Sequence, residues 1–228
     1  CHPFAVEIKD FTKPVDIPAV DVPAGYTTLF VFPYSVGFQF SGFKNLAALN
    51  EAITKRLKNL GVTTLLFMRH LELIEYEIKI PGKEASGEYL LDAEPINDHC
   101  TRVSAIESED DKTDESLSFI KFSMPIDSRV STRTIDVAFT VATDKEGKTT
   151  FQKAKNPYIS VYFPTETESK LDFIVQGPFR TTPNRSSVPA DEEENEALAE
   201  QTAKLLRQSV LELRDMGLLD LSLIRILP

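Results

Sequence analysis

LELIEYEIKIPG, residues 71–82, carries the pattern that decides the fold class of this chain. Apolar side chains alternate strictly with charged ones: Ile74, Tyr76, Ile78 and Ile80 against Glu75, Glu77 and Lys79. Successive side chains of a β-strand point to opposite faces of the sheet, so this alternation predicts a half-buried strand with one face in water. Such strands are typical of antiparallel sheets.

Shorter strand signals continue on both sides of this stretch. Upstream, YTTLFVF at residues 26–32 predicts a buried strand that Pro33 ends, and an apolar run at 65–68 precedes the alternating residues. Downstream, strands are predicted at 88–93, 99–106, 119–124, 135–141, 159–163 and 172–176. The residues DKEGK, 144–148, are a turn signal that predicts an antiparallel hairpin reaching Phe151.

Two helical periodicities frame these strands. Residues 44–60 and 192–216 carry apolar residues at three- and four-residue steps, and each is followed by a glycine, Gly61 or Gly217, at the position of a C-terminal cap. A short amphipathic stretch, 218–228, ends the chain. Strands dominate the middle and a long helix comes late, which predicts an α+β fold with a mainly antiparallel sheet and packed helices.

Composition excludes several classes of protein. The chain has 228 residues, 42% of them hydrophobic, which is enough to bury a core. Its net charge of −10 and the lack of a basic patch argue against nucleic-acid binding. No apolar run is long enough to cross a bilayer, so no membrane partner is expected and the protein is predicted to be soluble. Two cysteines, Cys1 and Cys100, favour a reducing compartment, and the cytoplasm is the expected location.

Familiar catalytic motifs are absent from the sequence. There is neither a GxxxxGK[ST] nor a GxGxxG loop, and a turn is the better explanation of Gly37 and Gly42. The sequence contains no GxSxG motif, and nothing in it links a histidine to Cys100. It therefore does not indicate a serine or cysteine nucleophile. His99 and Cys100 could supply two zinc ligands, but a structural zinc site needs four, so we predict no metal site. Both residues are predicted to be ordinary strand positions. The acidic run ESEDDKTDE, 107–115, predicts a solvated loop.

A polar loop with two arginines precedes the final helix. GPFRTTPNRSSVPADEEEN, residues 177–195, contains Arg180 and Arg185 and then a run of acids. The acids have a structural explanation, because carboxylates in the first turn of a helix interact favourably with its dipole. Taken by itself, Arg185 is explained by a surface ion pair with Asp191 or Glu192.

In this loop, and in several segments before it, the chain resembles the GHKL ATPases, in particular Hsp90 and the sacsin-like bacterial proteins. YTTLFVFPYSV (26–36) is similar to the late strand of the family's ATP-binding domain, and LLFMRHLELIEYEI (65–78) to the strand that leads into the following domain. YFPTETESKLDFIVQGPFRTTPNRSSV (162–188) resembles the strand, hairpin and loop of the middle, or transducer, domain. The helix from Glu192 matches the one after that loop, so the resemblance spans residues 26–217.

The resemblance implies two domains. Residues 1–62 would be an extended lead and the incomplete end of an ATP-binding domain, and residues 63–228 a transducer domain with the ribosomal protein S5 domain 2-like fold. The family's nucleotide-binding motifs are missing here, so ATP and Mg²⁺ would be bound mainly outside this chain, which would be inactive alone. Four prolines in the first 25 residues and the start at Cys1 also predict a segment of a longer polypeptide. Whether that polypeptide hydrolyses ATP stays open.

In Hsp90-like proteins the matching loop extends an arginine toward the γ-phosphate of ATP in the neighbouring domain. By position in the motif this catalytic, nucleotide-binding residue is Arg185, with Asn184 beside it and Arg180 as a third candidate contact. The implied function couples nucleotide state to domain rearrangement, with the upstream ATP-binding domain as partner and a protein client or a second copy as further partners. The alternative is a nucleotide-independent protein-interaction module. A nucleic-acid-binding role ranks last because of the acidic balance.

Overall fold

The computed structural model describes residues 44–228 apart from 69, 81, 110–111 and 128–129. The chain divides into two units, 1–56 and 57–228. This boundary lies a few residues before the one predicted after residue 62. The strand predicted at 26–32 and the glycines at 37 and 42 lie outside the described residues, as does the segment 26–36 on which part of the family resemblance rests.

The first predicted helix is confirmed as α1, Leu46–Lys58. Its start is fixed by Asn45, whose side-chain oxygen accepts a hydrogen bond from the backbone N–H of Ala48 at 2.9 Å. After the helix, Gly61 has φ 85°, a conformation that glycine adopts without the steric cost of a Cβ.

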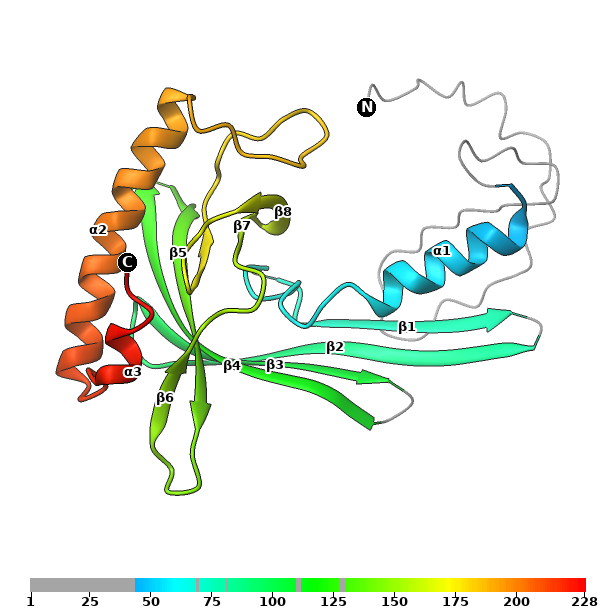
Figure 1. Ribbon diagram of the computed structural model, residues 1–228, viewed down its shortest axis with the longest axis horizontal. Helices are drawn as coiled ribbons and strands as arrows, with labels where there is room; N and C mark the ends of the chain where they lie inside the picture. Colours follow the sequence, from blue (N-terminus) through cyan, green and yellow to red (C-terminus); the bar gives the residue numbers. More distant parts are fainter. Residues whose placement is uncertain (1–43, 69, 81, 110–111, 128–129) are drawn as a thin grey trace. The chain divides into compact units, whose positions relative to one another are not determined.

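Nine strands of the described chain form one sheet with the order β1-β2-β3-β4-β5-β9-β7-β8, and β6 pairs with β5 outside this path (Figure 1). Their bounds are Leu73–Ile80 (β1), Lys83–Pro95 (β2), Cys100–Glu109 (β3), Lys112–Asp127 (β4), Val130–Thr143 (β5), Thr149–Gln152 (β6), Tyr158–Val161 (β7), Phe163–Glu168 (β8) and Ile174–Gln176 (β9). Every pair is antiparallel except β7 with β9. The α+β class with a mainly antiparallel sheet is therefore confirmed.

The alternating stretch forms β1, and it lies at one edge of the sheet next to β2. The apolar run before it was expected, from the family resemblance, to belong to the same leading strand. That expectation is wrong, because residues 63–68 form successive turns, with Leu66 N–H donating to the Thr63 carbonyl at 3.1 Å and Met68 N–H to the Leu65 carbonyl at 2.9 Å. The run is buried without ladder pairing: the turns satisfy some of its backbone groups, and the Leu66 carbonyl accepts from Lys121 Nζ of β4 at 3.2 Å.

The acidic run 107–115 was predicted to be a loop, and this is also wrong. β3 continues to Glu109 and β4 begins at Lys112, so most of the run is paired strand. Cations from distant parts of the chain offset its charge: Lys58 forms an ion pair with Glu109, and Lys155 Nζ lies 3.0 Å from Glu115 Oε1. A pattern read along the sequence alone does not contain these partners.

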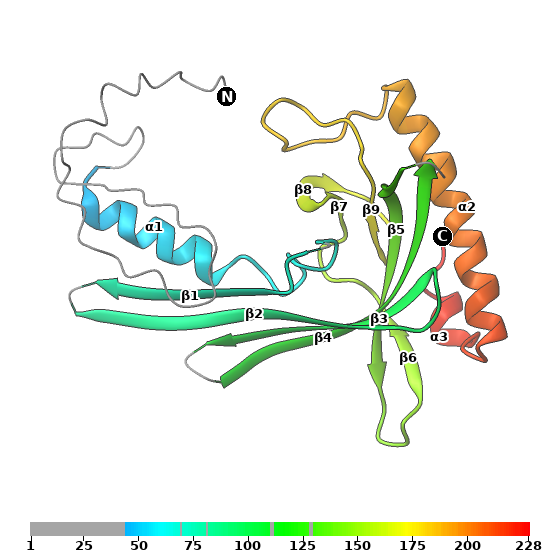
Figure 2. The same cartoon turned by 180° about the vertical axis from the view of Figure 1, so that it is seen from behind.

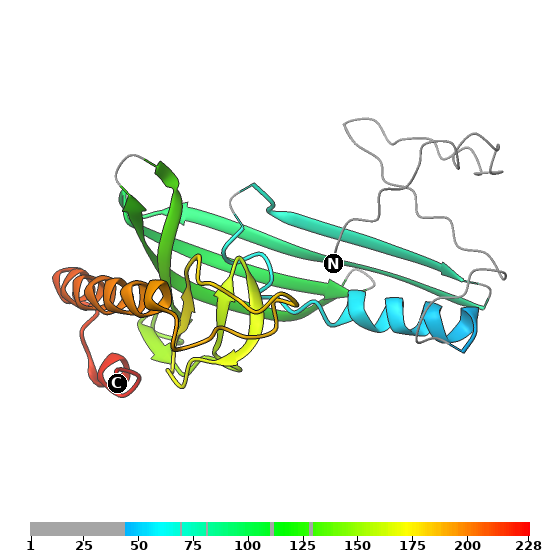
Figure 3. The same ribbon diagram turned by 90° about the horizontal axis from the view of Figure 1, so that it is seen from above.

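The two faces of the sheet carry separate apolar cores. On one face, side chains of β3, β4, β5 and β9 pack against α2, Glu193–Asp215, and α3, Leu221–Ile224. Figures 2 and 3 show α2 lying along this face of the sheet beside β4 and β5. On the other face, Leu65, Leu66 and Phe67 cover the side chains of Tyr89 and Phe119.

The C-terminal helices end and begin at local signals. After α2, Gly217 has φ 75° and its N–H donates to the Arg214 carbonyl at 2.9 Å, while Leu218 N–H donates to the Leu213 carbonyl at 2.8 Å. These bonds satisfy the last carbonyls of the helix, as expected for a glycine cap. The predicted helix 192–216 and its capping glycine are thus confirmed.

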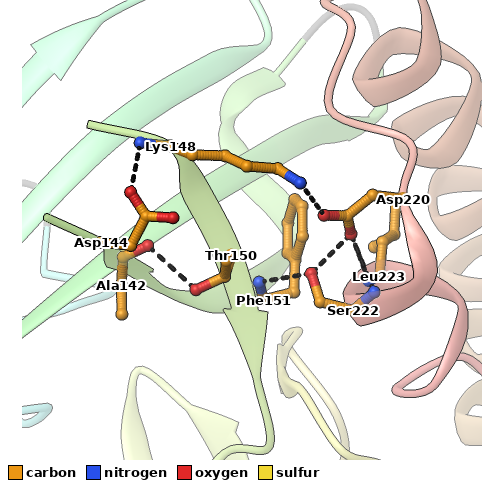
Figure 4. A network of polar contacts seen from close by, with 8 residues as sticks. All are labelled: Ala142, Asp144, Lys148, Thr150, Phe151, Asp220, Ser222 and Leu223. Atoms are coloured by element: carbon orange, nitrogen blue, oxygen red, sulfur yellow. Dashed lines mark hydrogen bonds and ion pairs between the residues drawn. The ribbon is translucent and has the colours of Figure 1, made fainter. Parts of the chain in front are cut away.

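A polar network ties α3 to the β5–β6 hairpin (Figure 4). Asp220 Oδ1 accepts from the backbone N–H groups of Ser222 at 2.8 Å and Leu223 at 3.1 Å and so caps the helix. The Ser222 hydroxyl then accepts from the backbone N–H of Phe151 in β6 at 2.9 Å. Lys148 Nζ, in the predicted hairpin turn, lies 3.5 Å from Asp220 Oδ2. These contacts lower the pKa of Asp220, chiefly through its hydrogen bond with Ser222.

Among the described residues, none of the helices combines the length and apolar character needed to cross a lipid bilayer.

Candidate functional site

The loop with the two arginines connects β9 to α2 and projects from the sheet beside β8 (Figure 1). At its base, Gly177 N–H donates to the Ser160 carbonyl of β7 at 3.1 Å. Phe179, only 8% exposed, then enters the core beneath α2. The start of the loop is therefore fixed to the sheet by one backbone bond and one buried ring.

Asn195, in the first turn of α2, holds both ends of the loop with one side chain. Its Oδ1 accepts from the backbone N–H of Arg180 at 2.7 Å. Its Nδ2 donates to the carbonyls of Arg180 at 3.0 Å and Pro189 at 2.8 Å. The residue is 4% exposed, so these hydrogen bonds are largely shielded from water. The segment 180–189 is thereby closed into a loop whose ends meet at the helix.

Arg180 is engaged by the acids at the helix start. Its Nε lies 2.7 Å from Glu194 Oε2 and its Nη2 lies 3.0 Å from Glu194 Oε1, a two-point pairing. Glu192 Oε2 lies 4.0 Å from Nη1. The hydrogen bond from Arg180 lowers the pKa of Glu194 and raises the pKa of Arg180 itself. Arg180, proposed from the sequence as a nucleotide contact, is thus placed as a structural partner of α2.

Within the loop, Asn184 and Thr182 organise a tight turn. Arg185 N–H donates to the Thr182 carbonyl at 2.7 Å, and Thr182 N–H donates to the Ser187 carbonyl at 2.9 Å. Asn184 Oδ1 accepts from the Thr182 hydroxyl at 2.7 Å and from the Ser186 hydroxyl at 2.9 Å. The Asn184 oxygen, predicted to lie near a nucleotide, is therefore used inside the turn.

Arg185 occupies the tip of this turn with φ 60°, in the left-handed region that non-glycine residues seldom adopt. The residue is exposed, and no hydrogen bond or ion pair of its guanidinium is found within the described part of the chain. The alternative explanation from the sequence, an ion pair of Arg185 with Asp191 or Glu192, is not found among the described residues. Arg180 pairs with the acids at the start of the helix instead. A strained backbone thus presents a cation that the rest of the described chain leaves unneutralised.

The far side of the loop is attached to the edge strand β8. Glu166 N–H donates to the Ser186 carbonyl at 2.7 Å, and Val188 N–H donates to the Thr167 hydroxyl oxygen at 2.9 Å. The neighbours of Arg185 are therefore held by β8 while the loop ends are held by α2. The exposed guanidinium of Arg185 is thus carried on a backbone that is hydrogen-bonded on both sides.

Sequence reasoning missed Asn195 and the pairing of Glu194. Both lie in the acidic helix start, where the dipole explanation of the carboxylates seemed sufficient. The available signal was a single asparagine directly after three glutamates, since asparagine is a poor residue for a helix interior and a good one for binding backbone groups. The charge of Arg133, on β5, also lowers the pKa of Glu194.

Other polar groups of the described chain do not assemble into a metal site: no group of three or more His, Cys, Asp or Glu residues there could hold a metal ion. His99 is exposed in the turn before β3, which corrects its expected strand position, whereas Cys100 begins that strand fully buried. A cavity of about 350 Å³ between Phe67, Leu117, Tyr158 and Ile174 is lined by none of the predicted site residues.

The Cys100 thiol is expected to be unreactive in the folded protein. Burial, with a smaller contribution from the charge of Glu212, raises its pKa to about 11, so the reactive thiolate is disfavoured at neutral pH. In a Cys1→Ser background, labelling by a thiol reagent at pH 8 should be on the order of 10²-fold slower in buffer than in denaturant. Equal labelling rates in the two conditions would contradict this placement.

Comparison of the chain with protein-family models, with curated proteins and with solved structures finds no match.

Proposed function

We propose that this chain is the transducer region of an Hsp90- or sacsin-like GHKL ATPase. In this proposal Arg185 contacts the γ-phosphate of ATP held in an upstream domain, and the sheet with α2 passes the nucleotide state on as a domain rearrangement. Residues 63–228 would then have the ribosomal protein S5 domain 2-like fold of transducer domains. Residues 1–62 would be an extended lead and the incomplete end of the ATP-binding domain.

The observation that carries the proposal is the contrast between the two arginines. The chain neutralises Arg180 with Glu194 but presents Arg185 at the tip of a hydrogen-bonded turn, with no anionic partner in the described residues. A guanidinium is permanently charged and offers a planar set of donors that matches phosphate oxygens. The net charge of −10 disfavours anions on average, so an anion would have to be bound by a local cation such as Arg185.

The chemistry that Arg185 would supply is charge compensation. In phosphoryl transfer, negative charge on the transferred group is stabilised mainly by positioned cations and donors, and a single arginine supplied from another domain is sufficient to gate the step. ATP and Mg²⁺ would be bound by the upstream domain. The loop residues of this chain would orient Arg185 and exclude alternative partners for it.

Amide hydrogen exchange in the complete polypeptide tests the proposal directly. A non-hydrolysable ATP analogue should slow exchange in residues 180–189, because the γ-phosphate contact restrains the loop, whereas ADP should leave it unchanged. Exchange in α3, which is remote in sequence and held by Asp220 and Ser222, serves as the internal control. Identical loop exchange without nucleotide, with ADP and with the analogue would refute the phosphate contact.

The alternative, a nucleotide-independent protein-interaction module, is favoured by one observation. β1 lies at the edge of the sheet order, and β2 is its only partner among the described strands. An extended peptide could add to such an edge through backbone hydrogen bonds. The two proposals separate in the exchange experiment, because the interaction module predicts no response of the 180–189 loop to nucleotide.

A further inference from the structure

We infer that Asn195 is the positioning residue for Arg185, acting through the backbone of the loop. This inference rests on the proposed function. A single amide side chain from the first turn of α2 bonds the backbone at both loop ends, at Arg180 and at Pro189. Arg185 lies between these two points, and its neighbour Ser186 accepts a hydrogen bond from Glu166 of β8, so its Cα is positioned by the helix together with that strand.

The chemistry of this contact requires an amide. The site presents one backbone donor, the Arg180 N–H, and two backbone acceptors, the carbonyls of Arg180 and Pro189. An amide has an acceptor oxygen and a two-proton donor nitrogen and satisfies all three. An ionised carboxylate of the same shape satisfies only the donor and sets a negatively charged oxygen against two carbonyl oxygens. Asn195→Asp is therefore nearly isosteric and electrostatically wrong.

The contact also makes α2 the mechanical link between the loop and the core. Leu198, Leu205 and Leu213 bury one side of α2 against the sheet, so its first turn is held in place. Loop ends bonded to that turn move with the helix. A displacement of α2 would then advance or withdraw Arg185 without changing any residue that contacts a nucleotide, which is the behaviour required of a switch element.

The test combines exchange with a double-mutant cycle in the complete polypeptide. Asn195→Asp should speed amide exchange in 180–189 and lower kcat for ATP hydrolysis by roughly 10-fold or more, because a misplaced catalytic group loses rate steeply with distance. KM for ATP should stay within about twofold, since ATP is bound mainly elsewhere. In an Arg185→Ala background, Asn195→Asp should lower kcat no further, because the two residues act through one contact.

Ser209→Ala is the matched control. Ser209 is fully buried in the same helix and its hydroxyl donates to the Leu205 carbonyl at 2.8 Å, but it does not contact the loop. This variant should reduce thermal stability while leaving kcat and loop exchange unchanged. A similar fall of kcat in Ser209→Ala would show that Asn195 has only a structural role.

The outcomes separate the inference from the function on which it rests. If Arg185→Ala lowers kcat but Asn195→Asp does not, the inference fails and the proposed function stands. If Asn195→Asp leaves loop exchange unchanged, or if the two substitutions lower kcat additively, the inference also fails. If the Arg185→Ala variant hydrolyses ATP at the parent rate, or if the parent protein has no ATPase activity, the proposed function fails. The positioning role of Asn195 fails with it, even if Asn195→Asp speeds amide exchange in the loop.

Discussion

Arg185→Ala is expected to lower kcat for ATP hydrolysis by the complete polypeptide roughly 10²- to 10³-fold, the range found when one stabilising donor or cation is removed from a transition state. KM for ATP should change little, because the contact that is lost is made mainly to the transferring phosphate. The Arg185 side chain has no partner in the described residues, and alanine keeps the backbone N–H, so the substitution should leave the melting temperature unchanged. Steady-state ATP hydrolysis and thermal denaturation measure the two effects separately.

Two further substitutions, compared with Arg185→Ala, divide the contribution of Arg185 into charge, shape and backbone. Arg185→Lys keeps the charge but loses the planar donors, so part of the rate should remain. Arg185→Asn removes the charge while keeping a residue that tolerates φ 60°, so its rate should equal that of Arg185→Ala. A large difference between the Asn and Ala variants would assign the effect to the turn.

Arg180→Ala is the control from the same loop. Its guanidinium is paired with exposed Glu194, and exposed ion pairs contribute little to stability. We expect a smaller loss of kcat than for Arg185→Ala, arising only from a looser loop. If Arg180→Ala loses as much as Arg185→Ala, or if Arg185→Ala loses nothing, the assignment of the phosphate contact to Arg185 is wrong.

The fold was predictable where one residue pattern determines one local structure. The alternation at 74–80 predicts β1 because a two-residue period is characteristic of a strand with one buried face, and the structure confirms it. The glycines after both long helices and the hairpin at 144–148 were predictable for the same reason, since each needs a backbone conformation that few residues adopt. These features depend on neighbours within a few positions.

The errors occurred where the local pattern fits more than one structure. The acidic run at 107–115 is mostly strand because β3 pairs with β4 there, and Lys58 and Lys155 form ion pairs with two of its carboxylates. The buried run at 65–68 forms turns, and apolar character alone does not distinguish a buried turn from a strand. In both cases the local pattern gives burial or charge but leaves the hydrogen-bonding partner undetermined.

The same limit applies to the candidate site. The sequence shows two arginines before an acidic helix start, but it does not show which arginine pairs with which acid. Arg180 reaches Glu194, fourteen positions away, and Asn195 reaches back to Arg180 and Pro189. These contacts exist because the chain reverses direction between β9 and α2, which the sequence shows only as a proline-containing polar stretch.

Phe139→Ala should have the largest effect on folding, a loss of about 3–5 kcal/mol in the free energy of unfolding. Phe139 is fully buried on β5, and its ring lies 5.3 Å from that of Phe173, 6.0 Å from Phe151 and 6.1 Å from Phe122. These rings come from β4, β6 and the segment before β9, so one substitution opens a cavity where several elements meet. Denaturant-induced unfolding measures the loss.

Phe163→Ala is the control for this prediction, because it removes the same side chain from β8, where Phe163 is 50% exposed and little burial is lost. Phe139→Leu should cost less than Phe139→Ala, since it leaves a smaller cavity. The core beneath α2 also carries the helix that binds the Arg185 loop. A Phe139→Ala protein that remains folded should therefore show faster amide exchange at 180–189. In a folded Phe163→Ala protein, amide exchange in this loop should depend on the contacts between the loop and β8. Equal stability losses for the two alanine variants would mean that the rings of Phe122, Phe151 and Phe173 close the space that Phe139 leaves.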